Sequence, residues 1–299
     1  MDLLLIVIPA FLIFAAGFIG QRLLKIDIKS ISTFSLYLLL PFLAFDTFYT
    51  NELNADYLYM FIFTVLLAVL LIGVTFLIGK IVKADRPHMS ALQLGSVFPN
   101  SGNYGAPVAL FAFGSMGFDY AVIIMVIHAF IINSLGIFIA SLGSSSPTGP
   151  KEAFIRLIRM PVLYGAIVGI LFQLFHIAIP PTIIDGISMV GEASIPVVML
   201  ILGMQLAEIK PQKFNLKYVS TVSALRMVIS PLLAVALVQL MPVNETIQHV
   251  FILLAAMPVA ANTTILAVQF DCKPELISFT TLVTTLLSLI TIPFVLYLL

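Results

Sequence analysis

Long apolar stretches recur along the whole chain and leave little sequence that could form a water-facing surface. Apolar residues make up 61% of the 299 residues, charged residues only 9%, and the mean hydropathy is +1.15. A soluble domain of this size carries about 25% charged residues. The stretches are long and lack the alternating pattern of a membrane β-barrel strand. The chain is therefore predicted to be an all-α integral membrane protein, in which helices satisfy the backbone polar groups within the bilayer.

Ten stretches are long and apolar enough to cross the membrane, because about 20 helical residues are needed to span about 30 Å of hydrocarbon. In chain order they are spans 1 to 10, at 3–21, 31–50, 57–80, 89–113, 118–142, 160–177, 188–207, 218–240, 248–270 and 275–298. The expected fold class is a bundle of ten transmembrane helices with short connections.

The basic residues lie in alternate connections between the predicted spans. Thirteen of the 14 are found there: Arg22, Lys25, Lys29, Lys80, Lys83, Arg86, Lys151, Arg156, Arg159, Lys210, Lys213, Lys217 and Lys273. The other connections carry acidic residues instead. Because Lys and Arg are retained on the cytoplasmic side, the pattern predicts a multi-pass protein of the cell (inner) membrane with both termini outside. The net charge of zero argues against a nucleic-acid partner.

A Gly/Ser/Pro-rich connection divides the ten spans into two sets of five. Residues 1–142 are predicted to form the first five-helix repeat, 143–157 a cytoplasmic linker, and 158–299 the second repeat. An odd number of spans in each half makes the second copy enter the membrane from the opposite side. The two repeats are therefore expected to be inverted.

A shared Pro-x-x-x-Asn pattern supports the repeat. Pro99 and Asn103 in span 4 lie 159 residues before Pro258 and Asn262 in span 9. Membrane helices are rich in proline, so a chance match is the alternative. The pattern occupies the fourth span of both halves, and this favours the repeat.

Spans 4 and 9 contain residues that interrupt helices. Pro99, Gly102, Gly105 and Pro107 gather in span 4, and Pro258 interrupts span 9. Proline removes a backbone donor and clashes with the preceding turn, and unwound backbone is tolerated at membrane depth only where it is buried in protein or lines a cavity. Two broken helices that cross are typical of secondary transporters, in which half-helix N-termini face an anionic substrate.

These segments resemble the auxin efflux carrier family. The resemblance rests on Pro-Asn-Ser-Gly-Asn-Tyr-Gly-Ala-Pro at 99–107, on Ala-Ser-Ile-Pro at 193–196 with Ile-Leu-Gly-Met-Gln-Leu-Ala at 201–207, and on 258–262. It covers essentially the whole chain. The chain lacks the long central loop of the plant carriers and is similar to the short microbial permeases, so auxin is not carried over as a substrate.

The resemblance implies a ten-helix fold related to that of the bile acid:sodium symporters, with spans 4 and 9 crossing. It also implies a scaffold of spans 1, 2, 6 and 7 and a transport core of spans 3–5 and 8–10. An elevator-like movement of this core would carry the substrate across the membrane.

Four polar residues at the two breaks are candidates for substrate binding. Asn103 and Asn262 could donate to a carboxylate, or could only tie off carbonyls that the prolines free. Ser101 and Tyr104 are secondary candidates, because hydroxyl groups in membrane helices also serve packing.

Arg226 is a basic residue inside a predicted span, where a charge normally faces a cavity or a partner. It could attract the anion or act as a fixed cation where related symporters hold sodium. Its long side chain could instead extend to the cytoplasmic interface.

Three titratable residues are candidates for proton coupling. Asp46 and Glu192 lie toward the outer ends of spans 2 and 7, where a simple interfacial role competes. His128 lies midway along span 5, where it could relay protons or only pack.

The predicted function is secondary transport of a small organic anion, a mono- or dicarboxylate, by elevator-type alternating access. Proton or sodium is a possible coupling ion, and a sodium-coupled symporter of the bile-acid type is the alternative. A channel is a remote alternative, as is an intramembrane enzyme, since the chain lacks the motifs of serine hydrolases and metalloproteases. No cofactor or metal is expected. Besides the lipid bilayer, a homodimer through the scaffold is a possible partner, through the Gly165-x-x-x-Gly169 face.

Overall fold

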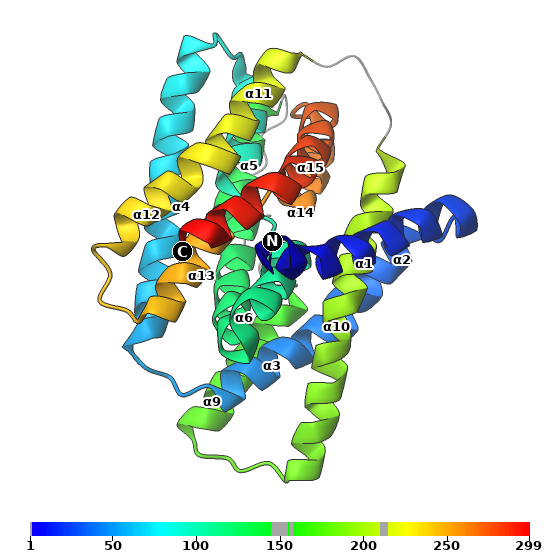
Figure 1. Cartoon of the computed structure of the whole chain (residues 1–299), viewed down its shortest axis with the longest axis vertical. Helices are drawn as coiled ribbons and strands as arrows, with labels where there is room; N and C mark the ends of the chain where they lie inside the picture. Colours follow the sequence, from blue (N-terminus) through cyan, green and yellow to red (C-terminus); the bar gives the residue numbers. More distant parts are fainter. Residues whose placement is uncertain (1, 145–154, 156–157, 210–214) are drawn as a thin grey trace.

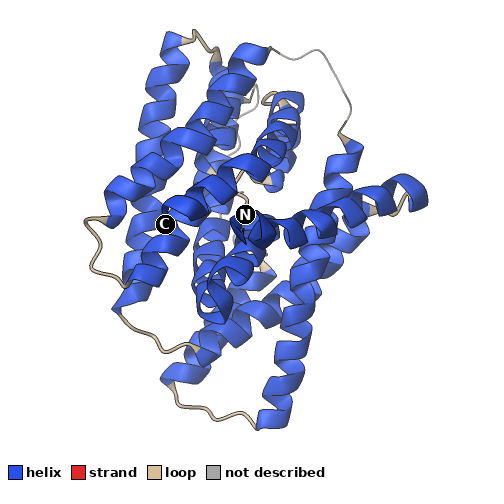
Figure 2. Cartoon of the chain, in the orientation of Figure 1, coloured by secondary structure: helices blue, strands red, loops and turns tan. Residues whose placement is uncertain are grey.

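The computed structural model describes residues 2–144, 155, 158–209 and 215–299, and these residues form helices without any β-strand (Figure 2). The all-α prediction is thus confirmed for the described residues. Most of the predicted linker 143–157 lies outside them. The division into two repeats therefore stays a prediction.

The helices follow one another with short connections (Figure 1). Their bounds are α1 Asp2–Leu24, α2 Ile28–Phe34, α3 Leu40–Thr50, α4 Ala55–Ile81, α5 Arg86–Val97, α6 Ala106–Ile131, α7 Ile137–Gly143, α9 Pro161–Leu174, α10 Pro181–Glu208, α11 Leu216–Ala224, α12 Ser230–Val238, α13 Glu245–Ala255, α14 Ala261–Phe270 and α15 Pro274–Leu298. Four π-helical turns join neighbouring pieces: η1 Ser35–Leu39, η2 Ser101–Gly105, η3 Ile132–Gly136 and η4 Leu225–Ile229.

Seven described helices are long and apolar enough to cross a membrane, which supports a multi-pass membrane protein. The predicted count of ten differs because three of the predicted spans are not uninterrupted long helices. α9 is short, and the region of span 9 consists of the short helices α13 and α14. The regions of spans 4 and 5 share one helical stretch, 101–143, which turns at Gly114. Its positive φ of 68° is a conformation that glycine adopts without strain. Ten spans therefore stay a prediction.

Side-chain caps start the two short helices that lead toward the middle of the molecule. The Asp85 carboxylate accepts a hydrogen bond from the His88 amide (2.9 Å) before α5, and Asn244 accepts one from the Ile247 amide (2.9 Å) before α13. Such caps satisfy amides that have no partner inside the helix. The capping bond also lowers the pKa of Asp85.

Helices α1, α3, α9 and α10 pack closely, and glycines permit this approach. A Cβ at Gly165 of α9 would lie 2.1 Å from the Pro41 carbonyl oxygen, and one at Gly203 of α10 would lie 2.0 Å from that of Phe14. The Gly165-x-x-x-Gly169 face thus packs on α3 of the same chain. This face had been a candidate for contact between subunits, but Gly169 is buried and Gly165 half-buried within the chain.

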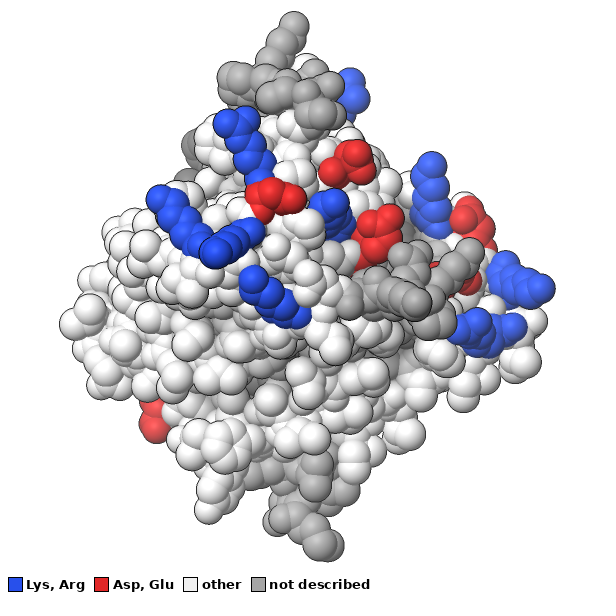
Figure 3. Space-filling model, turned by 90° about the horizontal axis from the view of Figure 1, so that it is seen from above, with Lys and Arg blue, Asp and Glu red and all other residues white. Residues whose placement is uncertain are grey.

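Helices α5 and α13, whose side chains are largely buried, contact most of the other helices: α4, α6, α7, α11, α12, α14 and α15. The Phe63 ring of α4 stacks on the Phe251 ring of α13 with centroids 3.8 Å apart. Lys and Arg side chains gather, with some Asp and Glu, over one part of the surface seen in Figure 3. The adjoining surface in that view is largely uncharged, as expected for a surface that faces lipid.

Candidate functional site

The two predicted breaks meet and pair with each other. The Asn100 amide donates to the Pro258 carbonyl (2.8 Å), and the Ala260 amide donates to the Phe98 carbonyl (3.0 Å). Pro99 and Val259 thereby form an antiparallel bridge. Each break supplies the partners that the other lacks, which allows unwound backbone deep inside an apolar molecule.

Helix α15 supports the pair of breaks with buried hydroxyl groups. The Thr284 hydroxyl accepts a hydrogen bond from the Val259 amide (3.2 Å), and the hydroxyls of Tyr104 and Ser288 are 2.9 Å apart. Thr284 and Ser288 also donate to carbonyls of α15 itself. Nothing in the sequence pattern had indicated that α15 carries these contacts.

Four helix ends converge at the breaks. Helices α5 and α13 end there with their carbonyl ends, whereas η2, which leads into α6, and α14 begin there with their amide ends. The first amides of a helix have no partner inside it and carry a partial positive charge. The same place therefore combines two positive and two negative helix ends.

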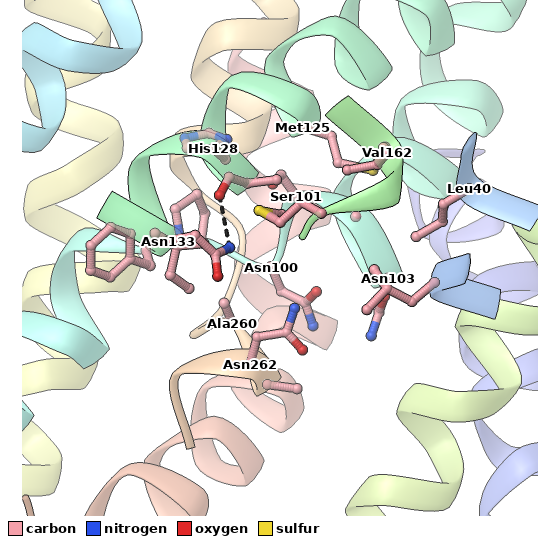
Figure 4. Close-up of a pocket in the computed structure, with 18 residues that line it drawn as sticks. Leu40, Asn100, Ser101, Asn103, Met125, His128, Asn133, Val162, Ala260 and Asn262 are labelled. Atoms are coloured by element: carbon pink, nitrogen blue, oxygen red, sulfur yellow. Dashed lines mark hydrogen bonds between the residues drawn. The ribbon is translucent and has the colours of Figure 1, made fainter. Parts of the chain in front are cut away.

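A cavity of about 110 Å³ lies at the two amide ends (Figure 4). Ser101, Asn103 and Asn262, all predicted site residues, line it together with Asn100 and Asn133. Residues of η1, α3, α6, η3 and α9 and neighbouring breaks complete the wall: Leu36, Leu40, Phe98, Pro99, Gly102, Met125, His128, Ala129, Ile132, Met160, Val162, Ala260 and Ala261. No acidic side chain is among these lining residues. The cavity is thus polar through carboxamides, one hydroxyl and an imidazole rather than through carboxylates.

Asn100 and Asn133 were not among the predicted site residues. Asn100 is 4% exposed, and its amide nitrogen has no hydrogen-bond partner among the described residues. In Figure 4 the side chains of Asn100 and Asn262 point toward one another. Asn133 instead donates to the Ala129 carbonyl (2.9 Å). The carboxamide of Asn100 is therefore free to donate into the cavity, and that of Asn133 is partly committed.

Tyr104 does not line this cavity. Its side chain is fully buried, its ring packs edge-on against Phe14 with centroids 5.0 Å apart, and its hydroxyl pairs with Ser288. This placement supports packing, the alternative role of such a hydroxyl, and not the predicted contact with substrate. The reason is that consecutive helical residues point in different directions, so Ser101 and Asn103 reach the cavity while Tyr104 faces α1 and α15.

Arg226 is also fully buried and does not extend to an interface. Its guanidinium group donates to the carbonyls of Ser96 (2.9 Å), Val97 (3.2 Å) and Ala255, and to the Ser230 hydroxyl (2.5 Å). It lies beside a separate small cavity of about 10 Å³ and not in the wall of the larger one. The predicted direct role in anion binding does not fit this position.

His128 lines both cavities, whereas the two carboxylates proposed for proton coupling lie elsewhere. Its ring nitrogen Nδ1 is buried without a partner among the described residues. Asp46 of α3 accepts a hydrogen bond from Ser188 of α10 (2.8 Å), and Glu192 of α10 is exposed. The structure therefore places His128 at the crossing, Asp46 between α3 and α10, and Glu192 on the exposed face of α10.

The helix-breaking residues shape the crossing without offering side-chain donors. Gly105 allows close packing, since a Cβ there would lie 2.5 Å from Leu254. Pro107 is buried in the first turn of α6. Within the described residues, no group of three or more His, Cys, Asp or Glu side chains could hold a metal ion.

Comparison with known proteins identifies the class to which this fold and site belong. A family model described as "Membrane transport protein", which represents the auxin efflux carrier family, matches residues 2–147 and 150–296. The chain belongs to this family of membrane transport proteins, and the predicted family is thereby confirmed.

Two similar proteins are archaeal. One, from Methanocaldococcus jannaschii, is 27% identical over 300 residues, which cover 98% of this chain and 96% of the relative. Another, from Methanothermobacter thermautotrophicus, is 24% identical over 297 residues, which cover 98% of this chain and 95% of the relative. Both are described as uncharacterized transporters.

Proposed function

We propose that the protein is a secondary transporter that moves a small organic anion, a mono- or dicarboxylate, across the membrane. The observation that carries this proposal is the cavity at the crossing. The amide ends of two half-helices and several carboxamides face this cavity, and none of the described residues that line it is acidic.

The chemistry of the cavity favours a carboxylate. Two helix N-termini offer unpaired amides and a positive dipole end, which stabilise an anion. Asn103 and Asn262 supply one carboxamide from each half of the chain, and the unpartnered Asn100 nitrogen adds a further donor. Ser101 contributes a hydroxyl at the same end of η2. A volume of about 110 Å³ suits a small substrate.

The mechanism we propose is an elevator movement of a core against a scaffold, within ten transmembrane spans arranged as two inverted repeats. The scaffold consists of α1, the α2–η1–α3 stretch, α9 and α10, and the core of the other helices. The hydrogen bonds of the crossing and the contacts of Arg226 join core elements only. The scaffold side of the cavity is apolar, through Leu36, Leu40, Met160 and Val162, and such a wall allows sliding with few polar contacts to break.

A sodium-coupled symporter of the bile-acid type is the second candidate function. A sodium site needs a cluster of oxygen ligands, which half-helix carbonyl ends supply in other transporters. The carbonyl ends of α5 and α13 are of this kind, but Arg226 already donates to them. Proton coupling through His128, which lines the cavity, or uniport fits this arrangement better. The orientation with both termini outside follows from the positive charges and belongs to the same proposal.

Uptake into proteoliposomes tests the proposed function. Purified protein is given a panel of labelled mono- and dicarboxylates, with and without a sodium or a pH gradient, and uncharged amide analogues serve as controls. We expect uptake of at least one carboxylate and none of its amide analogue. Uptake of cations or neutral solutes alone would contradict the proposal.

A further inference from the structure

The carbonyl ends of α5 and α13 meet at one buried side chain. The last carbonyls of a helix have no partner inside it and carry a partial negative charge. At the crossing two such ends lie in an apolar interior, because Val97 ends α5 and Ala255 ends α13. Without a compensating group these ends would leave unsatisfied acceptors of like charge side by side.

Arg226 satisfies both ends at once. One terminal nitrogen of its guanidinium donates to Ser96 and Val97 of α5, and the other donates to Ala255 of α13 and to the Ser230 hydroxyl. Ser230 itself donates to the Ala255 carbonyl (2.8 Å). The planar group thus holds the ends of two helices that are distant in sequence in one fixed geometry.

The acceptors form an oxygen cage of the kind that binds a metal cation. Three backbone carbonyls and one hydroxyl surround the guanidinium, and half-helix carbonyl ends are the groups that coordinate sodium in transporters with broken helices. A guanidinium group keeps its charge in proteins. It therefore supplies, as part of the chain, the positive charge that a bound ion supplies elsewhere.

We propose that Arg226 is a built-in cation that assembles the transport core, so that the crossing needs no bound metal ion. It is a positioning residue: it fixes the carbonyl ends of α5 and α13, and through them the Pro99–Val259 bridge and the amide ends that line the cavity. This inference rests on the proposed function only in treating the crossing as the transport core.

The cation that holds both breaks comes from the second half of the chain alone. The offset that aligns Pro99 with Pro258 aligns Arg226 with Leu67 of α4, which is buried and apolar. The first half thus carries no second cation at the matching position. Removal of Arg226 alone should therefore empty the cage.

Chemical rescue tests the proposal without knowledge of the substrate. The Tm of purified protein is measured for wild type, Arg226→Ala and Arg226→Met, in choline, sodium or a low, non-denaturing concentration of guanidinium. We expect the wild-type Tm to be equal in sodium and choline. Arg226→Ala should lose stability and regain most of it in guanidinium, which can enter the vacated cage. Arg226→Met should not regain it, because its side chain fills that space.

Two controls keep the outcome specific. Urea at the same concentration should not rescue Arg226→Ala, and guanidinium should not raise the Tm of Arg22→Ala, which removes an exposed arginine from the last turn of α1. If Arg226→Ala does not fold, Arg226→Lys should give an intermediate Tm, since it keeps the charge and loses the planar fork.

A positioning role also predicts an effect on binding. A transported carboxylate that raises the wild-type Tm should not raise the Tm of Arg226→Ala in choline. With guanidinium present, the same carboxylate should raise the Tm of Arg226→Ala. A wild-type Tm that is clearly higher in sodium than in choline would overturn the proposal. So would an Arg226→Ala protein whose Tm guanidinium does not raise. The melts of the ligand-free protein remain informative even if no carboxylate is transported, so failure of the proposed function is separately visible.

Discussion

At the scale of single residues, the two carboxamides at the crossing carry the proposed recognition. We expect Asn103→Ala and Asn262→Ala to weaken carboxylate binding about ten- to hundredfold, because each removes a donor to a desolvated charge. Calorimetry on detergent-purified protein measures this. Asn133→Ala is the matched control, since that side chain lines the same cavity but donates to Ala129. Normal binding by both variants, or an equal loss in the control, would contradict the assignment.

Tyr104 provides a second test at this scale, because the structure gives its hydroxyl a partner outside the cavity. Tyr104→Phe removes the contact with Ser288 and should lower stability by about 1 kcal/mol while leaving substrate affinity unchanged. Thermal unfolding and calorimetry on the same sample separate the two effects. A large loss of affinity with unchanged stability would instead support substrate contact by Tyr104.

The sequence reveals which residues break the helices but not how the broken ends are satisfied. Pro99 and Pro258 are recognisable because proline cannot continue a helix. Three of the four partners of Arg226 are not, since they are backbone carbonyls 29 to 130 residues away that any residue type would offer. The same limit explains why Asn103 was identified and Asn100 was not. A choice between them requires knowing which side of the break faces the cavity.

At the scale of whole elements, close packing through glycine joins α1 to α10 and α3 to α9. Gly165→Ala places a methyl group against the Pro41 carbonyl of α3 and should cost about 1–3 kcal/mol through overpacking. Gly73→Ala is the matched control, because no atom lies within 4 Å of its added Cβ. Thermal melts should show a clear fall in Tm for Gly165→Ala and none for Gly73→Ala. Equal melts would mean that α9 and α3 are not held this closely.

The Gly-x-x-x-Gly motif also shows what a pattern at this scale can predict. It correctly indicates a close helix–helix contact, since small residues let backbones approach. It does not identify the partner, which is α3 of the same chain through Pro41 and Phe45. A homodimer through the scaffold would therefore need another surface.

At the scale of the whole molecule, the family and the all-helical architecture could be predicted from the sequence. The number of spans cannot be checked by counting long unbroken helices in the structure, because some predicted spans are broken. Apolar length identifies a span only where the helix is continuous, and the crossing divides two of the predicted spans into short pieces. The count of ten comes from the apolar stretches of the sequence, and the basic residues in alternate connections agree with it without depending on helix continuity. The proposed movement belongs to this scale, because it concerns the position of the crossing between scaffold helices rather than any one contact.

Accessibility of the crossing from both sides of the membrane tests the central claim most directly. In a Cys272→Ser background, which removes the single native cysteine, a cysteine replaces Ala261 in the cavity wall. A membrane-impermeant thiol reagent is then added from either side of oriented vesicles, with and without a transported carboxylate. We expect modification from both sides and slower modification when the carboxylate is bound. Modification from one side only, at a rate that the carboxylate does not change, would contradict alternating access at this cavity.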